Sequence, residues 1–455
     1  MGPHDGRDPP ASIREPNTLT NDDLRSVVEG RVLLPGDDGF EQASKAWNRS
    51  VEQRVAAVVD AGDADDVAAV IRYARRSGLS VTAQPSGHGA SGDTEGVILL
   101  RTGRLDGVQV RPEERLARVG AGAKWGRVLA AAGPHGLTGL AGSSPVVSVT
   151  GYTLGGGLSW FSRKHGFAAD SVRAFEVVDA EGERATVTAE SDPDLFWALR
   201  GGGGDFALVT AMEFELYPAP HLYGGRLLWP GHRTREVFEA FQELTAEAPD
   251  ELAVWFNRVQ FPQAPPMVAL DVTFLGGESE GRALLGRLDK IDDVIADKRG
   301  MVAVADLGDI TAEPTDPTPG RSRAELLTGL DDAAVATLLD TPMEPVIVVQ
   351  LRHLGGALAA ARPGAGPSGP VAEPYLLYLL GLAVNPELSA AAGVKQAQFA
   401  GELGAQVGGR KPYTMLTQGE RAADAFTEET IGRLREIKRA RDPHGVLRAN
   451  FPVLA

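Results

Sequence analysis

A histidine enclosed by glycines is the feature that most constrains the fold of this chain. Residues 84–92 read Q-P-S-G-H-G-A-S-G, and a second glycine cluster, T-G-Y-T-L-G-G-G-L, follows at 150–158. Glycines carry no side chain, so their main-chain amides can approach a ligand closely. A diphosphate is a ligand that often needs such an approach. The pattern therefore predicts a nucleotide-type cofactor held by loops, with His88 touching or bonding to the cofactor itself.

Composition excludes several other functions. The formal net charge of -16 argues against nucleic-acid and anionic-membrane partners, which both need a positive field. The chain has no cysteine and no H-E-x-x-H pair, so we expect no metal site. A P-loop motif is missing, and the glycines at 201–204 do not have the Rossmann spacing. Apolar runs of roughly 18 residues and an export signal are also missing, so we expect a cytoplasmic protein without a membrane partner.

Hydrophobic periodicity predicts an α+β fold with three parts after a disordered N-terminus at 1–19. Residues 20–220 mix short strands with helices and are expected to hold the cofactor. Residues 221–409 alternate period-two strands with amphipathic helices, which is typical of an antiparallel sheet backed by helices. Residues 410–455 are expected to return to the first part and complete it.

The individual elements follow from the same patterns. The predicted strands are Leu79–Gln84, Val97–Leu100, Leu116–Ala121, Glu176–Asp179, Ala185–Thr188, Ala207–Tyr217, Leu252–Phe261, Met267–Leu275, Val346–Leu354 and Tyr375–Val384. The predicted helices are one that begins near Asp63 and ends at Gly78, then Trp125–Ala132, Pro193–Leu199, Arg233–Ala246, Glu280–Ala296, Ala324–Leu339 and Glu428–Arg441. The proline- and glycine-rich segment 362–370 is predicted to be a surface loop.

Three long motifs, together with residues 84–92, resemble a known family. They are V-T-G-Y-T-L-G-G-G-L-S-W-F-S-R-K-H-G-F at 149–167, D-P-D-L-F-W-A-L-R-G-G-G-G-D-F at 192–206, and R-L-R-E-I-K-R-A-R-D-P-H-G-V-L-R-A-N at 433–450. The family is the FAD-linked oxidases related to vanillyl-alcohol oxidase, with a PCMH-type FAD domain, and within it the singly histidyl-linked bacterial members of the berberine-bridge-enzyme-like branch. The resemblance covers about 45–453 and implies a two-part FAD domain with an inserted substrate domain.

This resemblance implies that FAD is bonded covalently to His88. It places further cofactor contacts at Ser86, Gly87, Gly89, Ala90, Gly142, Ser143, Ser144, Val147, Gly151, Tyr152, Gly155, Gly156, Gly157, Val209 and Asn450. The three consecutive glycines could instead form a tight packing crossing, and Val209 could be a core residue. Ser144 stands where doubly linked relatives carry a cysteine, and a hydroxyl cannot form that thioether. We therefore expect a single tether.

The family pattern also suggests residues for catalysis. Tyr413 resembles a tyrosine that projects towards the flavin and could accept a proton, although it could instead be structural. Tyr378 is a second candidate base. On the predicted strand 346–354, Gln350 and Arg352 share one face. Relatives often have a glutamate base at this strand, whereas Gln350 can only hold a substrate oxygen; with Arg352 and Asn257 it is expected to contact substrate.

The resemblance implies an FAD-dependent oxidase. Hydride would pass from a small-molecule alcohol, phenolic natural product or sugar to FAD, and O2 would reoxidise the flavin to give hydrogen peroxide. A dehydrogenase with another electron acceptor and a degenerate FAD-binding scaffold or tailoring partner remain alternatives. Met415, where some relatives have asparagine, and Gln350 favour the scaffold. The sequence leaves the substrate, the catalytic base, the electron acceptor and the oligomeric state open.

Overall fold

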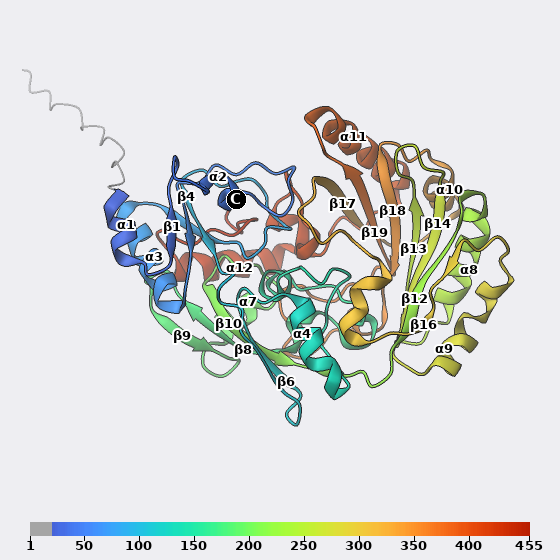
Figure 1. Cartoon of the computed structure of the whole chain (residues 1–455), viewed down its shortest axis with the longest axis horizontal. Coiled ribbons are helices and arrows are strands. Elements are labelled where there is room, and N and C mark those ends of the chain that lie inside the picture. Colours follow the sequence, from blue (N-terminus) through green and yellow to red (C-terminus); the bar gives the residue numbers. More distant parts are fainter. Residues whose placement is uncertain (1–20) are drawn as a thin grey trace, which may run out of the picture.

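The computed structural model describes residues 21–455, so the N-terminal disorder predicted for 1–19 lies outside the described residues. Figure 1 shows two bodies side by side. The first domain contains the N-terminal elements and, in red, the C-terminal helix α12 (Glu428–Arg441). The second domain contains a large sheet with helices on its outer side. The predicted α+β class, with an antiparallel-sheet second domain, is confirmed.

The first domain is built on two sheets. One has the order β1-β2-β4-β3, with β2, β4 and β3 parallel; its strands are β1 (Arg31–Leu33), β2 (Ala57–Asp60), β4 (Val97–Arg101) and β3 (Ser80–Ala83). The other is antiparallel with the order β5-β6-β10-β8-β9; its strands are β5 (Val108–Arg111), β6 (Leu116–Gly120), β10 (Leu208–Glu215), β8 (Val172–Val178) and β9 (Arg184–Val187). A short pair joins β7 (Leu137–Thr138) to β11 (Tyr217–Pro218).

Helix α3 (Ala64–Ser77) shows how local signals fix this domain. The Asp63 carboxylate caps it by accepting from the backbone amides of Asp65 and Asp66, and Gly78 ends it at a φ of 68°. Its apolar side packs on the parallel sheet through Val67, Val70 and Ile71. Strand β3 then leads directly into the loop that carries His88, as predicted. The other helices of the domain are α1 (Asn21–Val27), α2 (Phe40–Ser44), α4 (Trp125–Ala132), α5 (Val149–Leu154), α6 (Ser162–His165) and α7 (Pro193–Leu199).

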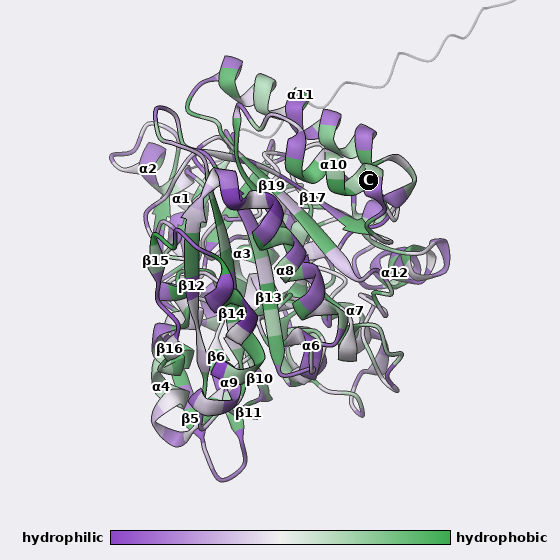
Figure 2. Cartoon of the chain, turned by 90° about the vertical axis from the view of Figure 1, so that its right-hand side faces the viewer, coloured by the Kyte–Doolittle hydropathy of each residue, from purple (hydrophilic) through white to green (hydrophobic). Residues whose placement is uncertain are grey.

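The second domain is an eight-stranded antiparallel sheet. Its strands follow the order β15-β12-β14-β13-β18-β19-β17, with β16 beside β12; they are β15 (Ala296–Asp297), β12 (Tyr223–Pro230), β14 (Met267–Phe274), β13 (Leu252–Val259), β18 (Val346–His353), β19 (Tyr375–Leu382), β17 (Gly320–Leu327) and β16 (Gly300–Met301). One face packs into a core beneath α8 (Thr234–Ala246), α10 (Asp332–Asp340) and α11 (Pro386–Leu403). Figure 2 looks at these helices, with hydrophilic turns outward and hydrophobic strands behind.

Three predictions about the second domain are wrong or incomplete, and two of its long elements were not predicted. Residues 324–327 end strand β17, and the helix begins only after Asp331, whose carboxylate caps the Ala334 amide. Helix α9 (Glu278–Leu285) passes into a short 3-10 turn and does not reach Ala296. Strand β12 and helix α11 were not predicted. The segment 362–370 is a loop that lies only partly at the surface, because Gly366 and Pro367 are buried and the Arg200 guanidinium donates to the Gly364 carbonyl.

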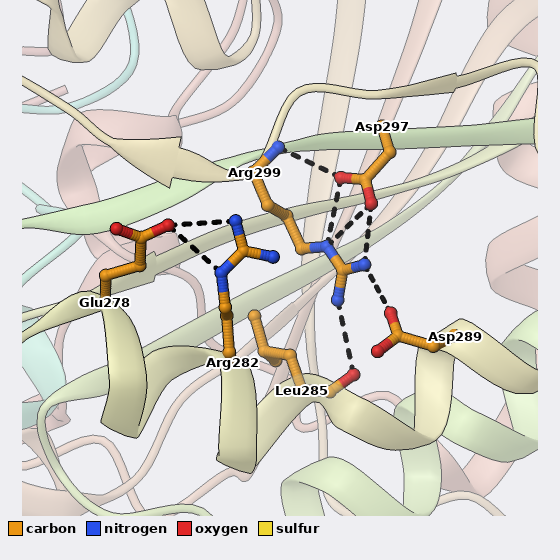
Figure 3. A network of polar contacts seen from close by, with 6 residues as sticks. All are labelled: Glu278, Arg282, Leu285, Asp289, Asp297 and Arg299. Atoms are coloured by element: carbon orange, nitrogen blue, oxygen red, sulfur yellow. Dashed lines mark hydrogen bonds and ion pairs between the residues drawn. The ribbon is translucent and has the colours of Figure 1, made fainter.

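A polar cluster at the edge of the sheet lies in the segment that joins α9 to β16 (Figure 3). Arg299 Nη2 pairs with Asp289 at 2.5 Å and with Asp297 at 2.6 Å, while Arg282 Nη2 donates to Glu278 at 2.8 Å. The Arg299 side chain is only 7% exposed. The cluster joins β15 to the turn after α9, while β15 and β16 themselves pair with β12 through their backbones.

Arg163 of α6 connects the two domains. It is buried, and its Nε donates to the Leu252 carbonyl at 3.0 Å and its Nη2 to the Ala248 carbonyl at 3.0 Å. Its Nη1 lies 3.1 Å from His353 Nε2 and donates to it. A nitrogen that accepts a hydrogen bond from a guanidinium cannot carry its own proton, so His353 is neutral here. Burial, followed by the Arg163 charge, lowers the pKa of His353 to about 3.

Because His353 is buried in its neutral form, we expect the stability of the fold to decrease in acid. Burial likewise lowers the pKa of His165 to about 4, from an ordinary 6.5. Between the ordinary value and the lowered ones, the unfolded chain binds protons that the folded chain refuses, so the free energy of unfolding should fall as the pH falls through this window. We expect the melting temperature to drop by several degrees on mild acidification, and the slope to be shallower in His353→Gln. The exposed-site variant His444→Gln should keep the parent slope; an equal slope in all three proteins would contradict this assignment.

The C-terminal segment is clamped to the first domain by a buried ion-pair cluster. Lys438 Nζ donates to Asp442 Oδ2 at 2.9 Å and to the carbonyl of Asp205 at 2.7 Å. The Asp205 carboxylate accepts from the backbone amides of Ala449 and Val453. We define the clamp as Lys438, Asp205 and Asp442. Next to it, residues 446–448 lie against β3, where the Val81 amide donates to the Val446 carbonyl. No helix in the described part of the chain is long and apolar enough to cross a membrane.

Candidate functional site

The His88 loop presents a neutral imidazole whose outer nitrogen has no partner. The ring stacks on Trp47 with centroids 4.0 Å apart, and Ser86 Oγ lies 2.9 Å from Nδ1. Burial, followed by the charge of Lys124, lowers the pKa of His88 to about 4. The Nε2 atom is buried and has no hydrogen-bond partner among the described residues. At neutral pH His88 is therefore an uncharged, oriented nitrogen nucleophile.

The glycines on the two sides of His88 have different surroundings. Gly87 has a φ of 88°, and a Cβ there would lie 2.8 Å from Gln84 Oε1. At Gly89 a Cβ would meet nothing within 4 Å, and the same holds for Gly151. Ala90 packs into a small apolar cluster. Gly89 and Gly151 thus border open space, whereas Gly87 and Ala90 shape the loop.

Six buried polar atoms without partners lie in the His88 loop, in segment 144–152 and in segment 47–49. They are Trp47 Nε1, Arg49 Nη1, His88 Nε2, Ser144 Oγ, Thr150 Oγ1 and Tyr152 OH; other such atoms lie elsewhere in the described chain, among them those of Tyr223, Trp229 and Thr273. A buried polar group without a partner is costly, so such groups mark places where a ligand supplies the missing contacts. Lys124 lies between these segments. Its charge acts on His88, and its backbone forms an isolated β-bridge with Ser148, the N-cap residue of α5. These donors fit a cofactor rich in acceptor oxygens and nitrogens, as FAD is.

The three consecutive glycines have a packing role. A Cβ at Gly155 would lie 3.2 Å from Thr414 Cα, one at Gly156 2.6 Å from Ser368 Oγ, and one at Gly157 2.5 Å from the Tyr152 ring. Because protein atoms fill these positions, the close crossing of the chain explains the glycines without a cofactor. Any contact they make with FAD stays a prediction.

The remaining predicted cofactor residues line the same segments. Ser144 is buried, Ser143 and Val147 are partly buried in the turn before α5, and a Cβ at Gly142 would lie 3.5 Å from the Tyr152 ring. Val209 lies in β10 and is part of the first-domain core, so its side chain is structural. Asn450 is partly exposed in the segment held by the clamp. Their contacts with FAD remain untested predictions.

The predicted substrate residues form one continuous row across the sheet of the second domain. Arg352 Nε donates to Gln350 Oε1 at 2.6 Å, and Gln350 Nε2 donates to Asn257 Oδ1 at 2.7 Å. Asn257 Nδ2 donates to Asp271 Oδ2 at 3.0 Å, and Arg226 pairs with the same carboxylate at 2.6 Å. We call Arg226, Asp271, Asn257, Gln350 and Arg352 the polar row. It lies on the face opposite the helix-covered core.

Two aromatic residues bring the polar row against the first domain. Trp255 of β13 stacks on Trp160, which follows the three glycines, with ring centroids 3.6 Å apart. The Arg352 guanidinium lies 3.9 Å above the Trp255 ring and 5.5 Å from the Tyr378 ring. The sequence analysis found Arg352 but missed Trp160, Trp255, Trp47 and Arg49. Tryptophans next to a motif were the available signal, but tryptophan is also an ordinary core residue.

The two candidate bases have different surroundings. Tyr413 OH donates to the Phe451 carbonyl at 3.0 Å, and burial, reinforced by Asp205, raises the pKa of Tyr413. Burial and the charge of Glu313 also raise the pKa of Tyr378, and the charge of Arg352 and a hydrogen bond with Ser322 oppose this rise only in part. Tyr378 lies directly opposite Gln350 in the sheet. The structure thus groups Tyr378 with the polar row, while Tyr413 is packed between Phe426 and Phe451.

Comparison with known proteins supports the fold and the cofactor. Residues 55–188 match the family model described as "FAD binding domain". The chain is 36% identical over 219 residues to the FAD-dependent monooxygenase FUP4 of Fusarium proliferatum, covering 47% of this chain and 42% of that protein. It is 31% identical over 205 residues to (R)-6-hydroxynicotine oxidase of Paenarthrobacter nicotinovorans, covering 44% and 45%. The chain thus spans less than half the length of these curated relatives.

Solved structures show the same fold over nearly the whole chain. The crystal structure of 6-hydroxy-D-nicotine oxidase from Arthrobacter nicotinovorans has a TM-score of 0.83 at 22% identity and covers 94% of this chain and 98% of that one. A solved histidine-to-alanine variant of berberine bridge enzyme has a TM-score of 0.81 at 17% identity, covering 95% and 99%. The fold is therefore that of the berberine-bridge-like oxidoreductases, with an FAD-binding domain and an antiparallel-sheet substrate domain.

Proposed function

We propose that this protein is an FAD-linked oxidoreductase that oxidises a small molecule between the polar row and the His88 side of the first domain. The observation that carries the proposal is the buried, unpartnered Nε2 of neutral His88, inside the segment that matches an FAD binding domain. FAD, when bound, supplies the hydride acceptor and the route for electrons to O2. The orphaned donors of Arg49, Ser144 and Tyr152 would hold it.

We further propose that His88 bonds covalently to the flavin ring. A neutral imidazole can act as a nucleophile, and Ser86 and Trp47 hold its ring in one orientation. Ser144 offers a hydroxyl and the chain has no cysteine, so a second tether, through a cysteine thioether, is excluded chemically. A single covalent link would keep the cofactor from dissociating.

The substrate would contact the second domain through Arg352, Gln350 and Tyr378. Gln350 cannot abstract a proton, and its side chain is already committed to Asn257 and Arg352. Tyr378 is the better-placed group for the proton, because it lies opposite Gln350 in the sheet and its ring is 5.5 Å from the Arg352 guanidinium, whereas Tyr413 is packed between two phenylalanines. Tyr413 would support the site by fixing the segment that ends at Phe451.

Replacing each tyrosine in turn tests this order. We expect Tyr378→Phe to slow anaerobic flavin reduction about 10²–10⁴-fold, the usual size of a general-base effect. Tyr413→Phe should change the reduction rate little but lower the melting temperature, since it loses the hydrogen bond to the Phe451 carbonyl. Stopped-flow absorbance measures both rates. The opposite result, a slow Tyr413→Phe and an unaffected Tyr378→Phe, would return the role of base to Tyr413.

The decisive experiment is an anaerobic substrate screen of the purified protein, read by loss of flavin absorbance. Similarity to (R)-6-hydroxynicotine oxidase and to the structure of a xylooligosaccharide oxidase suggests hydroxylated N-heterocycles and oligosaccharides for the first panel. Reduction by any compound supports the proposal, and readmitting air distinguishes an oxidase, which recovers its yellow colour quickly, from a dehydrogenase. A protein that contains no flavin after expression and reconstitution with FAD would overturn the proposal.

A further inference from the structure

A buried arginine without a counter-ion stands where the two domains meet. Arg352 is 9% exposed, and no carboxylate of the described residues forms an ion pair with it. Glu313 acts on it electrostatically, but Glu313 is an exposed residue beyond ion-pair distance. A charge removed from water without a partner is expensive, so natural proteins rarely keep one unless a ligand neutralises it.

Most of the hydrogen-bonding capacity of Arg352 is unused. A guanidinium has five N–H donors. The Nε donor goes to Gln350 Oε1 at 2.6 Å, while neither Nη atom makes a hydrogen bond within the described chain. The unused pair of Nη groups presents two parallel donors, the arrangement that matches the two oxygens of a carboxylate.

The direction of this pair is fixed before any ligand arrives. Trp255 covers one face of the guanidinium at 3.9 Å, and Trp160 supports Trp255 from behind at 3.6 Å. Gln350 cannot turn away, because its amide donates to Asn257, which in turn donates to Asp271. Such preorganisation reduces the entropy lost on binding.

Within the polar row, the positive charge of Arg352 is not balanced by a carboxylate. Arg226 neutralises Asp271 through Nε at 2.6 Å and Nη2 at 2.8 Å. Asn257 and Gln350 are uncharged, so their hydrogen bonds orient the Arg352 side chain but do not neutralise its charge. Where a glutamate replaces Gln350, as the family resemblance describes for relatives, that carboxylate would pair with the guanidinium. Glutamine leaves the positive charge free for a ligand.

The guanidinium also faces the side where the cofactor is proposed to bind. Burial raises the pKa of Tyr152 in the first domain, and the Arg352 charge opposes this rise. The same charge opposes the rise in the pKa of Tyr378 in the second domain. Arg352 is therefore close enough to act on both phenols.

We propose that the substrate of this enzyme is a small organic acid and that its carboxylate binds the two Nη groups of Arg352. This inference rests on the proposed function, because it names the class of molecule that the oxidoreductase site takes. A carboxylate is charged at neutral pH without help from the protein and fits both donors at once. The carbon to be oxidised would lie elsewhere in the same molecule, beside Tyr378.

Calorimetric titration of the full-length purified protein with benzoate and with benzamide tests the proposal without requiring turnover. The two probes share shape but differ in charge. We expect benzoate to bind at least about 10-fold more tightly than benzamide, the size of a charge-assisted hydrogen-bonded pair. Arg352→Gln should remove this preference, whereas Arg235→Gln, an exposed arginine on the far side of the sheet, should keep it.

Two further results decide the matter. Gln350→Glu places a carboxylate beside the guanidinium and should weaken benzoate binding while sparing benzamide, and it serves if Arg352→Gln does not fold. Equal binding of the two probes by the parent protein, or a benzoate preference that survives in Arg352→Gln, overturns the inference. Flavin reduction by neutral compounds alone, with no benzoate preference, would overturn it and leave the proposed function standing. If a protein without flavin still preferred benzoate to benzamide, and lost this preference in Arg352→Gln, the inference would stand and the proposed function would be overturned.

Discussion

His88→Ala is expected to release all flavin from the protein on acid denaturation, whereas the parent protein should precipitate yellow. His88 carries a buried Nε2 without a partner among the described residues, and the loop around it is the proposed place of attachment. The variant should still fold and bind FAD reversibly, because the orphaned donors of Arg49, Ser144 and Tyr152 remain. Loss of the electron-withdrawing histidyl substituent should lower the flavin reduction potential and slow substrate oxidation. Intact mass after denaturation and a redox titration measure the two effects.

A matched control separates the tether from a general effect of losing a histidine. His165 Nε2 is likewise buried without a partner among the described residues, and burial lowers the pKa of His165 to about 4, but His165 stacks on Tyr217 and lies outside the glycine-flanked loop. His165→Gln should therefore keep the covalent flavin mass. If the His88→Ala protein retained flavin after denaturation, the bond would lie at another residue. If the parent protein released its flavin, the covalent link would be wrong but FAD binding would stand.

Lys438→Met should cost about 3–5 kcal/mol of folding free energy, the usual penalty for breaking a buried ion pair from one side. The substitution keeps the length of the apolar stem but leaves the carboxylates of Asp205 and Asp442 buried without their cation; these residues are 1% and 3% exposed. Repulsion between the carboxylates should then loosen residues 446–453 from β3. Guanidinium unfolding curves measure the loss, and limited proteolysis should cut the loosened segment.

Neighbouring variants calibrate this result. Arg439 lies one position further along α12 and is exposed, so Arg439→Met should change the folding free energy by less than about 0.5 kcal/mol. Asp205→Asn should cost less than Lys438→Met, because an amide oxygen can still accept one of the two backbone amides of Ala449 and Val453. Similar stability of Lys438→Met and Arg439→Met would show that the clamp does not hold the segment.

Local signals in the sequence were enough to predict the elements that hold the cofactor loop. Asp63 and Gly78 mark both ends of α3 by physical rules that act within a few residues, and the alternation in 252–275 gives β13 and β14. The error at 324–339 arose because 324–327 follow a helical period, while pairing with β19 places them in a strand. Tertiary pairing overrides local preference in such cases.

The sequence was enough to predict several residues of the site, but not how their side chains contact one another. The alternation of strand 346–354 places Gln350 and Arg352 on one face, and this expectation agrees with the structure. Sequence alone could not show that Asn257 joins Gln350 to Asp271, because those contacts depend on the register between β13, β14 and β18. Nor could it show that Arg352 lacks a counter-ion, since an absent partner is a property of the assembled fold.

The clamp also bears on the order in which the protein can mature. Asp205 belongs to the first domain, yet the amides that satisfy its carboxylate come from Ala449 and Val453, which a ribosome makes only after the entire second domain. The parallel bridge between Val81 and Leu447 has the same property. Contacts so distant in sequence form late. The first domain therefore stays unfinished throughout synthesis of the second, and a nascent chain interrupted before Lys438 would lack the parts that complete the cofactor's domain.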